Sequence, residues 1–245
     1  MAAVGDLYGS VRAAGESAWL ASRAVAFLAF DNLSLVHSRI GTLDMLVLAP
    51  ILAAAWLALR DRWVLAGVFV ALGLLVKLTA IYALAAILAV LLLRWLATWR
   101  VSRRIRLVDV RPAVIVVAVS IGLWLAGLWA LDTQFSSFRS PIDHIAHMVE
   151  YGANLRSPVD RAGICATNDS YPGQWPCNEC QTTYLRVDVT VRSGQTIVAQ
   201  TPTIDFRGAL NPVLSGAIPL AMLFASWAAW RAKNELARWA VIWAA

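Results

Sequence analysis

The sequence has little charge and few polar side chains of any kind. Only 15% of its 245 residues are charged, whereas 60% are hydrophobic and the mean hydropathy is +0.64. Soluble domains average about 25% charged and about 45–50% apolar residues, so this chain has too few polar groups to cover itself in water. This composition excludes a disordered chain, a small disulfide-rich protein and a solenoid of polar repeats. It predicts an all-α polytopic membrane protein.

The spacing of the few interruptions predicts where the chain crosses the membrane. A bilayer core about 30 Å thick requires roughly 20 apolar residues per helix. We expect about six transmembrane helices, at 18–36, 43–59, 63–78, 80–96, 112–131 and 212–230, and a truncated seventh from residue 237. As one helix, the stretch 63–99 would be about 55 Å long, nearly twice the bilayer core. We therefore expect a tight turn at Lys77.

Basic residues are concentrated in three segments between the predicted spans. Residues 60–62, 94–111 and 231–238 each contain more arginine and lysine than acidic residues. The positive-inside rule places such segments on the cytoplasmic face. The predicted spans put an even number of crossings between each pair of segments, which agrees with the rule. The net charge of +6 therefore indicates membrane topology, not nucleic-acid binding.

These patterns divide the chain into three parts. We expect membrane helices over 1–131, an extracytoplasmic segment over 132–211, and a membrane helix with the start of another over 212–245. Residues 1–16 have no apolar run of the kind found in a secretory signal peptide. The final apolar run is too short to cross a bilayer, so we expect this chain to be part of a longer protein.

The predicted extracytoplasmic segment contains all three cysteines, Cys165, Cys177 and Cys180. Two of them can form a structural disulfide in an oxidising compartment, and the alternatives are free thiols or a metal site at the CxxC spacing of Cys177 and Cys180. No second ligand pair is evident, so no metal is assigned. Alternating valines over 183–199, with a turn at Ser193-Gly194, predict a small β-hairpin that caps the membrane domain.

Residues 143–151 are typical of an amphipathic helix just outside the membrane. His144 and His147 are three residues apart and therefore lie on one helix face. This pair either binds a metal or transfers protons, or it forms the hydrated face of an interfacial helix.

Charged side chains at the outer ends of the spans point to a functional site, because charge at membrane depth is costly. Arg39 and Asp44 lie at the junction of the first two spans, and the topology places Lys77 on the same face. Two cations and one carboxylate suit an anionic lipid-linked donor such as a polyprenyl phosphate. The alternative is an arginine–aspartate pair that only joins two helices.

Four short segments carry a resemblance to a known family. The run 30–44, FDNLSLVHSRIGTLD, resembles a signature of the protein O-mannosyltransferases, the GT-C membrane glycosyltransferases of family 39. Residues 73–79, which include Lys77, are similar to a lysine-containing span of that family. The segments 147–151 and 210–214 are similar to its outer helix and to the Asn-Pro that opens a later span.

The resemblance implies an inverting transfer of a sugar, typically mannose, from a polyprenyl-phosphate donor to an acceptor protein or glycan on the extracytoplasmic side of the cell membrane. It implies that Arg39 and Asp44 line the active site, that Lys77 contacts the donor phosphate and that His37 is a further substrate contact. The family's catalytic carboxylates lie in an earlier outer loop, so the resemblance places them upstream of this chain, which alone would be inactive. No cofactor other than the lipid-linked donor is expected, and the expected partners are membrane lipid, donor and acceptor.

A transporter or a non-catalytic assembly subunit is the alternative from another class. Transporters often contain internal repeats and place charges at mid-depth along a pathway. This chain has no convincing repeat, and its charges cluster at one face. The sequence therefore favours the enzyme.

Overall fold

A computed structural model describes residues 2–31, 43–102, 107–135, 138–154, 182–193, 196–208, 212–231 and 235–244. This part of the chain is mostly helical and contains one two-stranded antiparallel sheet. The elements are α1 (Ala2–Ala13), α2 (Ala18–Phe30), α4 (Leu43–Leu59), α5 (Trp63–Val76), η1 (Leu78–Ala80), α6 (Ile81–Ser102), α7 (Leu107–Phe135), α8 (Pro141–Asn154), β1 (Thr182–Ser193), β2 (Thr196–Gly208), α10 (Pro212–Arg231) and α11 (Glu235–Ala244).

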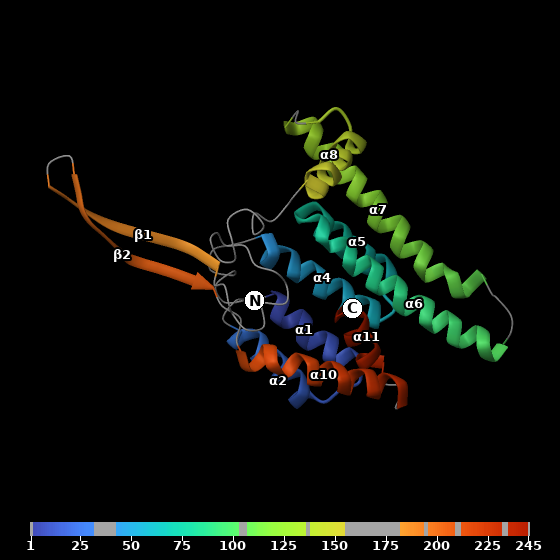
Figure 1. Ribbon diagram of the computed structural model, residues 1–245. Helices are drawn as coiled ribbons and strands as arrows, with labels where there is room; N and C mark the ends of the chain where they lie inside the picture. The colour runs from blue at the N-terminus through green and yellow to red at the C-terminus, as the bar shows by residue number, and fades with distance from the viewer. Residues whose placement is uncertain are drawn as a thin grey trace.

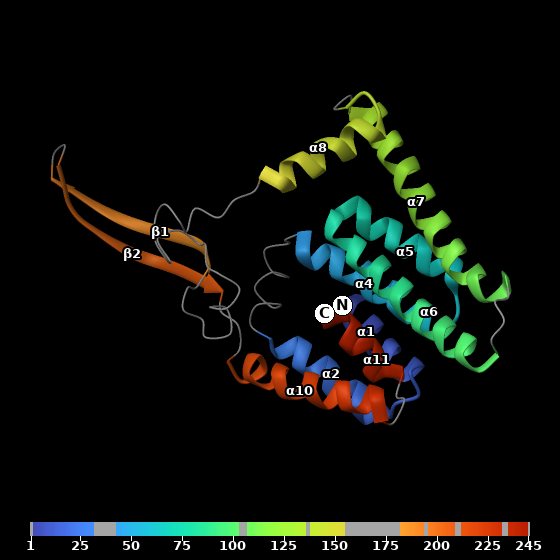
Figure 2. The same ribbon diagram turned by 45° about the vertical axis from the view of Figure 1, so that its right-hand side comes forward.

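Helices α4, α5 and α6 lie in the middle of the helical part, with α7 along its outer side, as Figures 1 and 2 show. Helix α5 packs against both α4 and α7, while α1 packs on α4 and α11 on α6. Helix α8 lies at the far end of α7, and the hairpin of β1 and β2 projects away from the helices in both views. The buried core lies between α4, α5, α6 and α7, where Val70, Leu74 and Ile87 are almost fully enclosed.

Small residues allow α5 and α7 to approach closely. A Cβ atom added at Gly67 of α5 would lie 2.9 Å from the Cβ of Val119 and 3.1 Å from the carbonyl oxygen of Val116. The buried hydroxyl of Ser120 donates a hydrogen bond to the Gly67 carbonyl oxygen at 3.2 Å. Glycine and serine at a helix contact are typical of membrane helices, where close packing replaces the hydrophobic effect as the driving force.

The predicted break at Lys77 is confirmed. Helix α5 ends at Val76, Lys77 has extended backbone angles, and the short helix η1 leads into α6. The Lys77 amide donates to the Gly73 carbonyl oxygen at 2.9 Å, which satisfies an end carbonyl of α5. A Cβ atom at Gly73 would lie 3.0 Å from the Cβ of Ala80, so glycine is what lets the chain fold back this tightly.

The predicted hairpin is also confirmed, but it is longer than expected. Its strands pair from Ser193 opposite Thr196 out to Thr182 opposite Gly208. Val187, Val189 and Val191 are all substantially exposed. The expected role as a cap over the helices is wrong for this arrangement, because the hairpin points away from them and nothing described packs on its apolar face (Figure 2).

Two of the described helical segments are long and apolar enough to cross a membrane by themselves, Leu78–Arg100 and Val110–Phe135. Shorter apolar helices occupy Ala18–Ala29, Leu43–Leu59 and Trp63–Val76. Helix α1 was not among the predicted spans. It forms over a polar N-terminal stretch because small residues let it pack on α4, with Gly9 against the ring of Trp56.

Candidate functional site

Two of the predicted site residues meet at one end of the helices. Asp44 lies in the first turn of α4, and Lys77 lies at the end of α5. The ammonium of Lys77 donates a hydrogen bond to Oδ1 of Asp44, which also makes the contact an ion pair. The other predicted contacts, Arg39 and His37, lie outside the described residues, as do Cys165, Cys177 and Cys180.

The Lys77–Asp44 pair is accessible from outside the protein. The side chains of Lys77 and Asp44 are 35% and 56% exposed. An exposed pair of this kind stabilises a fold by at most about 1 kcal/mol, so structural need alone is a weak reason for it. The carboxylate of Asp44 also lies at the positive end of the α4 dipole. An incoming anion would compete with Asp44 for Lys77, whose ammonium has two further protons to donate.

A large, mostly apolar cavity begins two residues beyond Lys77. Its volume is about 710 Å³, and Thr79 and Tyr82 supply the polar groups in its wall. Ile51 of α4 and Ile242 of α11 also line it. The remaining lining residues are four alanines of α6, Ala83, Ala85, Ala86 and Ala89, whose side chains are small. Its lining is therefore mostly apolar, with two polar side chains from the residues that follow Lys77 in the sequence.

A second polar contact joins α7 to α8. Nδ1 of His144 lies 2.8 Å from Oδ1 of Asp132, and Asp132 is only 5% exposed. Phe138 stacks on the His144 ring with centroids 4.1 Å apart. The second carboxylate oxygen of Asp132 is buried without a hydrogen-bond partner. Asp132 could not be selected from the sequence, because its position inside α7 and its contact with His144 depend on how α7 and α8 pack.

This geometry bears on the two interpretations of His144 and His147, a functional pair or the hydrated face of an interfacial helix. His144 is bonded to Asp132, whereas His147 lies beside Phe138, with ring centroids 5.4 Å apart. Across the residues that the structure describes, no three histidine, cysteine or acidic side chains come together as a metal site. The arrangement joins α8 to α7 through a carboxylate and an imidazole.

Basic residues occupy the opposite end of the helices. Arg94 of α6 lies 3.5 Å from Asp61 in the turn between α4 and α5, and Arg94 and Arg238 line one small cavity. Guanidinium groups also lie over tryptophan rings at this end, Arg60 over Trp56 and Arg231 over Trp230. The three basic segments that the sequence grouped together thus contribute to one end. Asp44 and Lys77 belong to the start of α4 and the end of α5, and these helix ends lie at the other end (Figure 2).

No protein family, curated protein or solved structure matches this chain. The resemblance to the O-mannosyltransferases therefore rests on the motif residues themselves. Asp44 and Lys77 are the two motif residues with an assigned role that the structure describes.

Proposed function

We propose that this chain is the donor-binding part of a membrane glycosyltransferase that moves a sugar, by resemblance mannose, from a polyprenyl phosphate to a protein or glycan acceptor. The observation that carries the proposal is the contact between Lys77 and Asp44, which are 33 residues apart in the sequence and come from different helices. In this proposal Lys77 binds the donor phosphate and Asp44 binds or orients the sugar.

Membrane embedding is supported by the apolar surface of the helices. Seven large apolar side chains of α10 are at least 55% exposed: Val213, Ile218, Leu220, Leu223, Phe224, Trp227 and Trp230. Soluble monomers rarely expose contiguous apolar patches of more than a few hundred Å², so lipid is the natural solvent for this surface. Together with α6 and α7, it favours a chain that crosses the bilayer several times, with the Lys77 end facing outward.

The short helices fit this proposal if their polar flanks lie at headgroup depth. Helix α5 has 14 residues, which corresponds to about 21 Å, less than the bilayer core of about 30 Å. Bilayer thinning and the reach of flanking Arg and Lys side chains accommodate such a mismatch at modest cost. Arg62 precedes α5 and Lys77 follows it, so both ends have such a residue.

The apolar cavity lined by Thr79 and Tyr82, which follow Lys77 in the sequence, supports a lipid-linked donor in particular. A polyprenyl phosphate has one anionic group and a long apolar tail. Lys77 offers a cation to the first, and the cavity of about 710 Å³ offers an apolar wall to the second. A water-soluble nucleotide sugar would require several polar groups that the described cavity wall does not contain.

A binding measurement on the chain itself tests the donor site. The purified protein in detergent is titrated with polyprenyl phosphate and, separately, with the neutral polyprenol, and binding is followed by native mass spectrometry. We expect preference for the phosphate, at least tenfold weaker phosphate binding in Lys77→Gln, and tighter binding in Asp44→Asn because a competing carboxylate is removed. Arg60→Gln, at the opposite end, is the matched control and should not change affinity.

Equal affinity for phosphate and alcohol, or an unchanged affinity in Lys77→Gln, would refute the donor site. Sugar transfer is tested separately in membranes from cells that express the gene, with polyprenyl-phosphate-mannose as donor. Transport of a solute without transfer of the sugar would support the alternative class, a transporter. If the protein binds lipid normally but shows neither sugar transfer nor solute transport, the result would favour an assembly subunit.

A further inference from the structure

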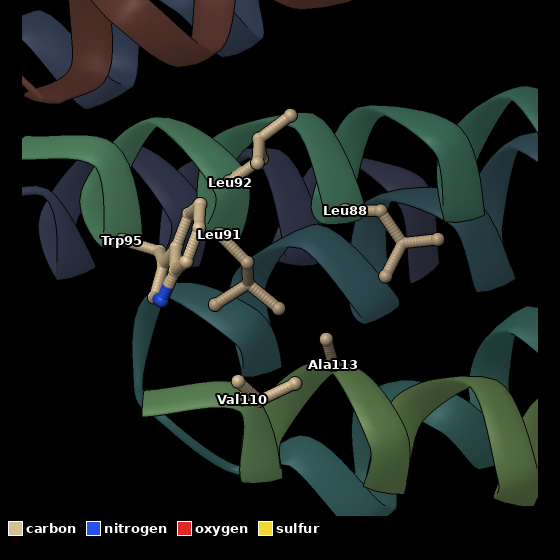
Figure 3. A pocket seen from close by; sticks show the side chains of 6 residues that line it. All are labelled: Leu88, Leu91, Leu92, Trp95, Val110 and Ala113. Atoms are coloured by element: carbon tan, nitrogen blue, oxygen red, sulfur yellow. The ribbon is translucent and has the colours of Figure 1, made fainter. Parts of the chain in front are cut away.

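Two apolar features of the described residues have no part in the proposed donor site. One is a pocket of about 260 Å³ between α6 and α7, where Figure 3 shows Leu91 and Trp95 pointing from α6 toward α7. Its wall is aliphatic and aromatic throughout, so it does not distinguish one apolar occupant from another. The other feature is the hairpin of β1 and β2, and the sequence along one of its edges indicates a partner.

The hairpin consists of two long strands, and no third strand lies beside them in the part of the chain that the structure describes. It projects away from the helices, which therefore do not cover its edges (Figures 1 and 2). Val189 and Val191 of β1 are 47% and 53% exposed, and their cross-strand partners Thr201 and Ala199 are exposed as well. A lone two-stranded hairpin is only marginally stable in water, whereas three or more strands with an apolar face can be stable. A further strand would therefore stabilise this hairpin.

The two edges of the hairpin differ, and β1 offers the better edge for a further strand. Strand β2 contains Pro202, which has no amide hydrogen to donate, and two residues without a partner in β1, Val198 and Thr203. Prolines and bulges of this kind protect a strand edge against further pairing. From Leu185 to Ser193, β1 contains no proline, and each residue has a partner in β2. The outer edge of β1 can therefore accept another strand.

The sequence of β1 is complementary to itself when two copies run antiparallel about Thr190. In this register Thr190 lies opposite the same residue of the second copy, and Val189 lies opposite Val191. Asp188 lies opposite Arg192, so one pair of opposite charges forms on each side of Thr190. Opposite charges and β-branched side chains directly across neighbouring strands stabilise a sheet. The strand therefore provides charge complementarity for a second copy of this chain.

Neighbouring registers are less favourable. If the two-fold axis passed through Val189, Arg186 of one copy would lie opposite Arg192 of the other, and like charges at such positions destabilise a sheet. If the axis passed through Val187, regular pairing would stop at residue 185, because the extra residue Tyr184 interrupts β1. The first register avoids both problems and pairs a longer regular stretch of β1.

We propose that the edge of β1 is a dimer interface, at which a second copy pairs antiparallel about Thr190 to form the four-stranded sheet β2-β1-β1-β2. Each copy contributes the same residues, as a two-fold interface requires. Main-chain hydrogen bonds between the edges supply the affinity, and the pairs of Asp188 with Arg192 fix the register. From Thr190 back to Thr182 is about 26 Å at 3.3 Å per residue, so the helices of the two copies lie at opposite ends of the sheet. The interface does not depend on sugar transfer or on the Lys77 site.

Charge reversal in β1 tests the interface in the protein with its native cysteines. The dimer dissociation constant of the purified chain in detergent is measured by sedimentation over a range of concentrations. Asp188→Arg and Arg192→Asp each place like charges opposite one another and should weaken the dimer about tenfold or more. The double variant Asp188→Arg/Arg192→Asp restores opposite charges and should return the constant to within about threefold of the wild type. Asp143→Arg, the same change at an exposed position of α8, is the control and should leave the constant unchanged.

Disulfide cross-linking tests the register itself. Cys165, Cys177 and Cys180 are replaced by serine, and a single cysteine is introduced as Thr190→Cys. Residues directly opposite each other in antiparallel strands have Cα atoms about 4.5–5.5 Å apart, which is within reach of a disulfide. Thr190→Cys should therefore form a covalent dimer on mild oxidation. Gln200→Cys, directly opposite Thr190 in β2, is the matched control and should not, because both β1 strands would lie between the two cysteines.

Three results would overturn the proposal. A chain that is monomeric at every concentration would show that the edge of β1 does not pair with a second copy. A dimer that the single charge reversals do not weaken, or that the double variant does not restore, would place the contact elsewhere. Equal cross-linking through Thr190→Cys and Gln200→Cys would show random collision of hairpins. The charge variants decide the matter by themselves if the serine variant does not fold.

Discussion

Gly67→Ala should weaken the protein because it forces α5 and α7 apart. The new methyl group would lie 2.9 Å from the Cβ of Val119 and 3.1 Å from the backbone oxygen of Val116. Neither atom is the end of a flexible side chain, so the helices themselves must move. Overpacking of this kind costs about 1–3 kcal/mol. Alanine is also a better helix former than glycine by about 1 kcal/mol, which offsets part of this cost.

Gly122→Ala in α7 is the matched control. It is the same change within a long apolar helix, but no atom lies within 4 Å of the added methyl group. It should therefore show the gain in helix propensity alone. The difference in unfolding free energy between the two variants isolates the packing cost, and we expect it to be about 1–3 kcal/mol. Gly127→Ala should fall between them, because its methyl group meets the mobile end of Leu75.

Equilibrium unfolding in mixtures of dodecyl maltoside and sodium dodecyl sulfate measures these differences. Helix content is followed by circular dichroism for the wild type and the three variants under identical conditions. If Gly67→Ala is as stable as Gly122→Ala, the close crossing of α5 and α7 is not present in the folded protein, and the arrangement of the central helices has to be revised.

Three further predictions concern single polar residues. His144→Ala should leave the buried carboxylate of Asp132 unpaired and lower the free energy of unfolding by about 1–3 kcal/mol. Hydrogen exchange in α8 should become faster, and unchanged exchange would show that the contact does not hold α8. Asp61 has a positive φ of 55°, so Asp61→Gly should stabilise the protein by up to about 1 kcal/mol in thermal unfolding. A loss of stability would mean that the ion pair of Asp61 with Arg94 outweighs the backbone strain. Burial raises the pKa of Asp6, so the folded state binds this proton more readily than the unfolded state and loses stability as the pH rises through the raised pKa. Asp6→Asn should therefore raise the melting temperature slightly at pH 7 and have no such effect at a pH below the ordinary aspartate value, and a gain that is the same at both pH values would contradict this cause.

The sequence predicted those elements whose boundaries depend on local chemistry. The span 43–59 coincides with α4, and the break at Lys77 follows from the length of the apolar stretch. Ser17 accepts a hydrogen bond from the Leu20 amide, so the start of α2 at Ala18 has an ordinary N-cap signal. The hairpin followed from alternation, which is a local pattern as well.

Features that depend on contacts between distant segments could not be predicted in the same way. Helix α7 continues to Phe135, beyond the expected end at 131, and this extension brings Asp132 to His144. The assignment of residue 132 to an outer loop treated a charge as a helix boundary, which fails when another helix provides a partner for that charge. The sequence placed Lys77 and Asp44 only on the same membrane face. That these two side chains pair with each other depends on how α4 and α5 pack.

The contact between Gly67 and Ser120 also constrains the order of events during synthesis. These residues are 53 positions apart, so at about 5–20 residues per second the ribosome reaches α7 roughly 3–10 s after α5. During that interval the small-residue face of α5 has no α7 to pack against. Helix α4, on which α5 also packs, has already been made by then, so α4 and α5 can assemble first and α7 joins them as a second step. A defect at Gly67 would therefore act late, on a helix pair that had already formed, and would leave partly assembled protein for quality control to remove.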